Sequence, residues 1–545
     1  MGTDGEKGKM GWGSLGRLGP ELISLVIDKF KIGENQNHSY RYLARGYTLE
    51  LCNYYRLSQY ATISRAWQHE VERRCFRSLD LYSAEDIAIL SRLLSRCPGR
   101  RAYLSHINLS RLPKSMTPGR WSLHPLTFRA GVAALLAVLH RCDEEDERAG
   151  IPTDAMLCLE LKFSWDMKLH AYPRPFPEWT LLEDPSPEPL PSSRRVRELV
   201  IENHGVHPIA VAQFATAMPQ LEVLWFAYYD PAIGRHKEQR DALVRSLNSL
   251  SGKLPRLKEL NIRRAEDHCV SNHSLACQSL ADDEGVDLVN EAVRKLARPT
   301  VEKLCLRNWL LSEDLLLNRR RDASAAANNT WPKLCDLELS NSVMAPNGKW
   351  YVTGQPSDVP SDPHQYPDTV AVMADMDIKA GMGTEPRGVG SARENGADLD
   401  HRWRQHIDDS TLSPLLETLA EAVTKHMPQL REVKFLVGGR YQDDNRGPQE
   451  PSLAVLYDER FADELKLWEL ERRGTFQQWD IPQSLRDAWK YSSDGQGVTV
   501  TDVGLRPGME VEEVVAAANP SEGEEEEADA GDNDASSSEF EMEMD

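Results

Sequence analysis

The chain has 545 residues, of which 40% are hydrophobic, and a formal net charge of −21. This length exceeds what one hydrophobic core organises, so we expect two or more structural units. The acidity and the lack of a basic, aromatic-rich stripe exclude nucleic acid as a partner.

The first predicted elements are two apolar helices, which follow a polar segment of residues 1–14 that we expect to be disordered. The first helix begins at Pro20, whose missing N–H is tolerated in a first turn, and it is apolar on most sides through Phe30. The second helix follows Ile63 and continues through Phe76. Because helices this short and apolar cannot close a core alone, they must pack against a partner or the rest of the chain.

These two helices resemble an F-box, whose pattern begins Leu-Pro-x-Glu-Leu and later places a hydrophobe, Ser or Cys, a basic residue and Trp. Ser64 and Arg65 match the later part of this pattern, whereas Gly19 replaces its first proline and residues 31–55 form a longer connection than usual. The resemblance implies that residues 15–77 bind a Skp-type adaptor and, through it, a cullin–RING ubiquitin ligase. The matching residues that it identifies as adaptor-binding are Leu18, Pro20, Glu21, Leu22, Val26, Ile27, Phe30, Ile63 and Trp67.

One local pattern recurs over residues 78–440: a helix, often ended by proline, then an apolar residue, two variable residues and two apolar residues separated by one. The strands that this pattern predicts are Leu79–Leu81, Leu104–Leu109, Leu157–Leu161, Val196–Ile201, Leu221–Phe226, Leu257–Ile262, Val301–Leu306, Leu334–Leu339 and Leu430–Phe435. The helices that it predicts include Ala84–Arg96, Pro208–Met218, Gln239–Leu250, Val286–Leu296 and Leu412–His426.

A single helix–strand unit cannot bury its apolar face, but stacked units can, which is the physics of leucine-rich-repeat solenoids. We therefore predict an α/β chain: a short all-helical F-box, then an irregular leucine-rich-repeat-like solenoid. An ordinary α/β domain with parallel strands is the alternative. Residues 341–410, rich in Gly, Pro and Asp, are expected to form a disordered insertion, and the proline-rich residues 166–194 an extended loop.

After the last repeat the helix–strand pattern gives way to short predicted strands. Short strands are predicted at Leu453–Tyr457, Leu465–Trp468 and Gly474–Phe476, with a closing helix from Pro482, so residues 441–495 read as a strand-rich cap over the last repeat. Residues 496–545 are expected to be disordered, because residues 519–545 contain twelve acids and no base. This order resembles a family of F-box proteins of filamentous fungi, through Met427–Leu430, Trp479, Ala488 and Trp489.

Motifs that would indicate catalysis are missing: there is no Walker A loop, GxSxG, HExxH or dinucleotide-binding glycine pattern, so we expect no enzyme and no cofactor. His268, Cys269, His273 and Cys277 have the side chains of a zinc site but lack paired spacing, and we expect no metal. The nine cysteines form no CxxC pair, which favours reduced thiols. With a polar N-terminus and no run able to span a bilayer, we expect a soluble intracellular protein, cytoplasmic or nuclear, with no membrane partner.

The outward positions of the predicted strands are the expected contacts for a protein substrate, since aromatic and arginine side chains anchor interfaces. The candidate residues are Trp225, Asn261, Arg263, Arg307, Trp309, Glu338 and Lys434. The resulting hypothesis is a substrate-receptor subunit of a Skp–cullin–RING ligase. The alternative is a repeat scaffold whose F-box-like start packs internally.

Overall fold

The computed structural model divides the chain into two units. The first, Met1–Asp502, is compact and contains all the described residues, whereas the second, Val503–Asp545, lies outside them. The described ranges are 19–32, 60–81, 83–111, 125–152, 156–163, 189–201, 206–230, 236–266, 279–318, 329–341, 344–354, 406–438, 452–458, 468–473, 480–492 and 499–502.

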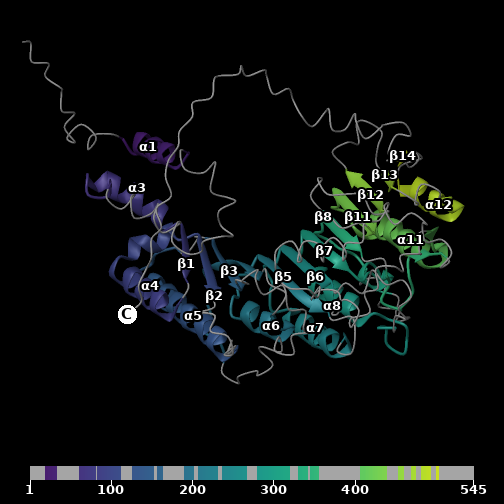
Figure 1. Cartoon of the computed structure of the whole chain (residues 1–545), viewed down its shortest axis with the longest axis horizontal. Coiled ribbons are helices and arrows are strands. Elements are labelled where there is room, and N and C mark those ends of the chain that lie inside the picture. The colour runs from purple at the N-terminus through teal and green to yellow at the C-terminus, as the bar shows by residue number, and fades with distance from the viewer. Residues whose placement is uncertain are drawn as a thin grey trace, which may run out of the picture. The chain divides into compact units, whose positions relative to one another are not determined.

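A twelve-stranded sheet in the described residues organises this unit (Figure 1), and its strands follow one another in chain order. The strands β1 to β8 and β11 pair in parallel, β12 and β13 pair antiparallel, and β14 pairs parallel to β13. Their bounds are β1 Ser78–Leu81, β2 His106–Arg111, β3 Leu157–Phe163, β4 Val196–Ile201, β5 Val223–Asp230, β6 Glu259–Glu266, β7 Lys303–Trp309, β8 Asp336–Asn341, β11 Glu432–Gly438, β12 Ser452–Asp458, β13 Trp468–Arg473 and β14 Thr499–Asp502.

A helix or 3₁₀ turn separates most of the parallel strands along the chain, and Figure 1 shows α6, α7 and α8 in a row along one face of the sheet. Their bounds are α1 Pro20–Ile32, α3 Arg65–Cys75, α4 Ala84–Arg96, α5 Pro125–Arg148, α6 Pro208–Thr216, α7 His236–Leu250, α8 Leu288–Ala297, α11 Asp409–His426 and α12 Gln483–Ser492, with 3₁₀ turns η3 Pro98–Tyr103 and η7 Glu313–Leu315. None of the helices in the described part of the chain combines the length and apolarity needed to cross a bilayer.

The recurring apolar pattern explains the order of the strands. Before β5, β6 and β7 its first apolar residue lies just ahead of the strand and is fully buried, at Leu221, Leu257 and Val301. The next apolar residues align in register from strand to strand, so that Leu224 neighbours Leu260 and all of them join one continuous core. Each fully buried leucine contributes about 1.5–3 kcal/mol relative to an exposed one, and it can be buried only if the neighbouring repeat is present.

Side chains at the starts of the helices fix where these begin. Ser83 accepts a hydrogen bond from the backbone N–H of Asp86 and caps α4, while Asp287 and Asp408 do the same for α8 and α11. Pro208 stands in the first turn of α6, where no N–H is needed. The helices predicted from the sequence are all present with small shifts, whereas α5 was not among them.

The prediction that residues 341–410 are a disordered insertion is wrong at both ends. Asn341 ends β8, and β9 (Val352–Thr353) pairs antiparallel with β10 (His406–Ile407), so that both ends of residues 355–405 meet at this ladder. The cause is apolar burial: Met344, Trp350 and Val352 form a small core with Leu310. Residues 355–405 lie outside the described residues.

The predicted cap is present in altered form. Strand β12 and helix α12 agree with prediction, and β13 and β14 were not predicted with these bounds. The strands predicted at 465–468 and 474–476 lie outside the described residues, except for Trp468, which begins β13. Leu485 of α12 is fully buried and belongs to the main core, so this helix extends the apolar layer beyond α11. The loop predicted at 166–194 falls outside the described residues, except for residues 189–194.

Candidate functional site

The N-terminal helices α1 and α3 form a pair with its own small core. Ser64 caps α3, its hydroxyl accepting from the backbone N–H of Trp67. The indole of Trp67 packs with Ile23 of α1 and with Val71, and these three side chains are buried separately from the core of the sheet. Two helices therefore satisfy part of their apolar surface by pairing with each other.

The apolar residues left uncovered by this pairing lie on α1. Leu22 is 52% exposed and Leu25 is 59% exposed, although large apolar side chains are usually buried. Because they are three residues apart, they are neighbours on one side of the helix. Sequence reasoning identified Leu22 but missed Leu25, which the spacing from Leu22 could have indicated.

The other predicted adaptor contacts have varied positions. Pro20 and Glu21 are exposed, and Val26 and Ile63 are half-buried against the small core. Trp67 was identified as an adaptor contact, but the structure does not leave it open for one, because it is 1% exposed and fills the space between α1 and α3. Leu18 and the side chains of Ile27 and Phe30 lie outside the described residues.

Polar contacts hold the pair together and join it to the first repeat. Arg74 donates from Nη2 to Ser24, to the carbonyl at 2.9 Å and to Oγ at 2.7 Å, across fifty positions of sequence. Arg100 of η3 donates to Glu72 of α3 at 2.6 Å and lies 5.0 Å from the ring of Phe76. The guanidinium of Arg100 holds the pKa of Glu72 below its ordinary value.

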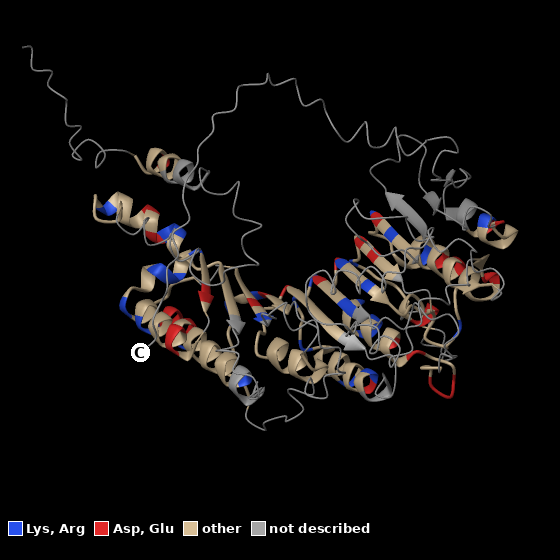
Figure 2. Cartoon of the chain, in the orientation of Figure 1, with Lys and Arg blue, Asp and Glu red and all other residues tan. Residues whose placement is uncertain are grey.

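The second candidate site is the outer face of the sheet, defined as the side that carries the residue between the two buried apolar positions of each strand. Register places these residues in one row from β1 to β11: Asp80, Asn108, Glu160, Val200, Trp225, Asn261, Cys305, Glu338 and Lys434. Figure 2 shows residues of both charges along these strands.

Six of the seven predicted substrate contacts lie on this outer face. Trp225 neighbours Asn261, and Glu338 neighbours Lys434. Arg263 neighbours Arg307 on the adjacent strand, one outward position further along. Arg307 donates from Nε to Glu338 Oε1 at 3.1 Å, and Lys434 pairs with Glu432 at 2.5 Å. The structure thus brings together side chains that are far apart in the sequence.

Trp309 was predicted to lie on the binding face, and this is wrong. Asn308 has a φ of 54°, in the left-handed region, and the register between β7 and β8 shifts between Leu306 and Trp309. This bulge turns Trp309 inward, where it is 1% exposed. Its Nε1 donates to Asn290 Oδ1 at 2.9 Å, and its ring meets Tyr228 edge-on at 5.6 Å.

Two cysteines on the outer face are poor nucleophiles. Burial raises the pKa of both Cys158 and Cys305 to about 12, so their reactive thiolate forms are scarce near neutral pH. Cys305 is also 1% exposed, in the row between Asn261 and Glu338. These thiols therefore favour a structural role.

Ser78, His106 and Glu160 have the residue types of a hydrolase triad. Ser78 Oγ lies 3.0 Å from His106 Nδ1, and His106 Nε2 lies 3.1 Å from Glu160 Oε2. In the usual triad, histidine Nε2 faces the serine and Nδ1 faces the carboxylate, whereas His106 has the two reversed. In addition, Lys162 Nζ lies 2.7 Å from Glu160 and neutralises its charge. We interpret the three as a polar ladder across β1, β2 and β3.

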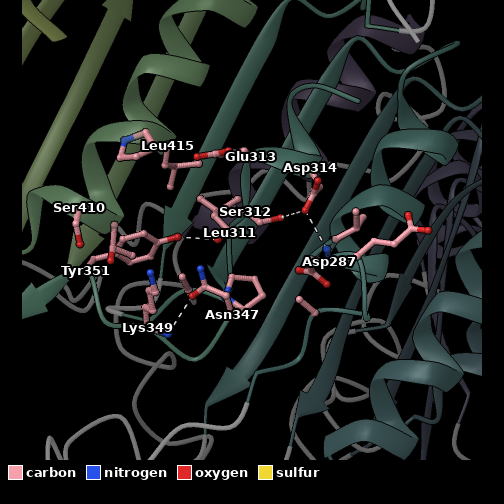
Figure 3. A pocket seen from close by; sticks show the side chains of 18 residues that line it. Asp287, Leu311, Ser312, Glu313, Asp314, Asn347, Lys349, Tyr351, Ser410 and Leu415 are labelled. Atoms are coloured by element: carbon pink, nitrogen blue, oxygen red, sulfur yellow. Dashed lines mark hydrogen bonds between the residues drawn. The ribbon is translucent and has the colours of Figure 1, made fainter. Parts of the chain in front are cut away.

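A cleft of about 760 Å³ lies where the loop before α8, the residues after β7, segment 345–351 and the start of α11 meet (Figure 3). Its two buried carboxylates, Asp287 and Asp314, have partners. Asp287 accepts from Arg240 at 2.7 Å, and Asp314 Oδ2 accepts from Ser312 Oγ at 3.1 Å and from the backbone N–H of Asp287 at 2.9 Å. Burial raises the pKa of Asp314.

Other bonds around this cleft join segments of the chain. Figure 3 shows Tyr351 pointing toward Leu311, whose carbonyl accepts from the tyrosine hydroxyl at 2.6 Å. Asn290 donates to the Leu310 carbonyl at 2.8 Å. Because these polar groups are occupied in holding α8, η7 and segment 345–351 together, the lining offers support for the fold rather than a nucleophile paired with a base.

The possible zinc ligands His268, Cys269, His273 and Cys277 lie outside the described residues. Within those that are described, no group of three or more His, Cys, Asp or Glu side chains is placed to hold a metal ion.

Comparison of the chain with profiles of protein families, with curated proteins and with solved structures finds no match.

Proposed function

We propose that this protein is the substrate-receptor subunit of a Skp–cullin–RING ubiquitin ligase, without catalysis of its own. The observation that carries the proposal is the exposed pair Leu22 and Leu25 on a helix whose opposite side is packed on α3. Exposed leucines that neighbour each other on one helix favour contact with another protein. In the F-box-like segment, that protein is a Skp-type adaptor.

The sheet supplies the second half of this function. We propose that β1 to β11 and their helices are an irregular leucine-rich-repeat-like solenoid, supported by the strict chain order of the strands and the aligned leucines. Its outer face would hold a protein substrate while the N-terminal helices hold the adaptor and, through it, the cullin. This assignment places the protein inside the cell, in the cytoplasm or nucleus.

Binding of a purified Skp-type adaptor to the full chain tests the proposal. In the double variant Leu22→Glu, Leu25→Glu, two apolar side chains lose their contacts, at about 1.5–3 kcal/mol each, so affinity should fall at least about a hundredfold. Biolayer interferometry with immobilised adaptor measures this loss.

The matched control is Ile151→Glu, Met156→Glu. These side chains are 46% and 57% exposed, comparable to the two leucines, but they lie beyond the end of α5. The control should bind the adaptor as the wild type does, and the melting temperatures of both variants should stay close to that of the wild type. Equal binding by all three proteins would refute the proposed interface.

A second candidate is a repeat scaffold in which the helical pair belongs to the fold and meets no ligase. The observation that favours it is the internal bonding of α3, through buried Trp67 and the Arg100–Glu72 pair. Under this interpretation the wild-type chain does not bind the adaptor. It also predicts that the change Glu72→Gln lowers the melting temperature of the sheet as well as of the pair.

A further inference from the structure

On the outer face, the described structure leaves a polar atom of Asn261 unsatisfied. Asn261 is 8% exposed, and its Oδ1 is buried without a hydrogen-bond partner. Its strand neighbours Leu260 and Ile262 point into the core, so the amide of Asn261 faces outward by alternation. A buried acceptor without a donor costs about 1–3 kcal/mol, and this cost is recovered when a ligand supplies an N–H.

Two arginines lie one outward position further along the strands. Arg263 and Arg307 are register neighbours on β6 and β7, about 4.8 Å apart at the backbone, so their charges repel each other. Glu338 pairs with Arg307, whereas Arg263 is exposed and meets no carboxylate in the described part of the chain. A carboxylate from outside would complete this cluster, and arginine binds carboxylates through two parallel hydrogen bonds.

A partly exposed indole lies on the other side of Asn261. Trp225 is its register neighbour on β5, and half-buried Val200 is the neighbour of Trp225 on β4. An apolar surface, an acceptor oxygen and a cationic cluster are therefore adjacent on strands β4 to β7. The geometry of the sheet places the backbone positions of Arg263 and Trp225 about 8 Å apart, a distance that two or three residues of extended peptide span.

We propose that the outer face at Trp225, Asn261, Arg263 and Arg307 binds an extended acidic peptide segment. Its carboxylate meets the arginines, and an aromatic or aliphatic side chain two or three residues away meets Trp225. Its backbone N–H meets Asn261 Oδ1 after the side chains that cover this buried oxygen shift aside. The identification of this peptide as part of a ubiquitin-ligase substrate rests on the proposed function; the binding chemistry does not.

Local charge must provide the attraction, since the chain as a whole carries a formal charge of −21 and repels acidic peptides. The probe is a short fluorescein-labelled peptide in which two adjacent Asp precede Gly and Phe. Its control has both Asp replaced by Asn. Fluorescence anisotropy with the full chain should give at least about tenfold tighter binding of the acidic peptide, the value of one charge-assisted hydrogen bond.

Two protein variants localise the binding. Arg263→Glu should weaken the acidic peptide at least about tenfold, and more than the control peptide, because a like charge replaces the partner. Arg245→Glu is the matched control: it changes another exposed arginine, on α7, and should bind like the wild type. Equal affinity for both peptides, or equal losses in both variants, would overturn the proposal.

The change Asn261→Leu separates binding from folding. Removing an unsatisfied acceptor should keep or raise the melting temperature while weakening the peptide several-fold, whereas a merely structural asparagine would lose stability and leave affinity unchanged. Adaptor binding by Arg263→Glu keeps the two hypotheses apart. Arg263→Glu should still bind the adaptor as the wild type does. In the wild-type chain, adaptor binding without peptide binding refutes only the peptide site, and peptide binding without adaptor binding refutes only the ligase assignment.

Discussion

The helical pair α1–α3 and the sheet bury their apolar residues in different ways. The core of the pair contains three fully buried side chains, Ile23, Trp67 and Val71, from segments about forty residues apart. The core of the sheet is one continuous cluster from Leu81 to Leu485, to which every repeat adds its leucines. A small core cannot cover all of its helices, so apolar surface remains at Leu22 and Leu25, where a partner could bind.

The largest expected loss of stability comes from removing a core side chain, and it should be confined to the core from which that side chain is removed. Trp67→Ala should cost about 3–5 kcal/mol, more than a small pair can lose, so α1 and α3 should unfold while the sheet stays folded. Leu304→Ala should cost about 2–5 kcal/mol and lower the stability of the sheet. Hydrogen exchange read by mass spectrometry distinguishes the two patterns; loss of protection in the sheet of the Trp67 variant would mean that both regions fold as one.

Breaking a buried ion pair beside the sheet should cost more free energy of unfolding than breaking a partly exposed one at the helical pair. Next to the sheet, Arg195, just before β4, donates to Asp143 at 2.7 Å and to Asp146 at 2.9 Å on α5, all three side chains being buried. Arg195→Ala removes one charged partner from each carboxylate, while Asp146 keeps Arg101 and Asp143 keeps Ser193, so the loss should be about 1.5–3 kcal/mol, as for a hydrogen bond to a charged group. At the pair, Arg100→Ala opens a contact that water reaches and should cost about 1 kcal/mol. Urea unfolding measures both, and equal losses would contradict the comparison.

Lowering the pH should change stability in opposite directions through Glu72, in the helical pair, and Asp314, beside the sheet. Glu72 has its pKa lowered below 4.5 by Arg100, so its contribution is present above 4.5 and is lost as the pH falls through the lower value. Asp314 has its pKa raised above 3.8 by burial, so its contribution is present below 3.8 and is lost as the pH rises through the higher value.

Melting temperatures of single variants between about pH 3 and pH 7 check these signs. Glu72→Gln should destabilise near pH 7 and become neutral near pH 3, because the carboxylate that it removes is protonated there anyway. Asp314→Asn should be least harmful, or stabilising, near pH 7. Parallel pH profiles for the two variants would show that one of the assigned causes is wrong.

The smallest effect is expected on the outer face. Lys303 pairs with Glu259 at 3.1 Å, but the lysine side chain is 45% exposed. Because water screens such a contact, Lys303→Ala should change the free energy of unfolding by about 0–1 kcal/mol. A larger loss in urea unfolding would mean that the outer face contributes to stability as the core does, and would weaken its interpretation as a free binding surface.

Local pattern was sufficient for the repeats and insufficient at their edges. The apolar residues of strands such as Leu257–Ile262 predict burial on one side by alternation alone, and the parallel pairing follows from stacking. The ordered segment 344–354 was missed because its burial depends on Leu310, a residue from another part of the chain. Asn261 was identified as outward-facing, but that its Oδ1 lacks a partner depends on every neighbouring strand.

The sequence by itself determined the α/β class, the places of most strands and the apolar character of the N-terminal helices, because periodicity and proline act through nearby residues. Only the tertiary structure decided which apolar side chains remain free. Trp67 is covered by Ile23, Leu25 is left open, and a single left-handed residue, Asn308, turns Trp309 away from the outer face. These outcomes depend on which distant segments meet, and burial is a property of that meeting rather than of the residue.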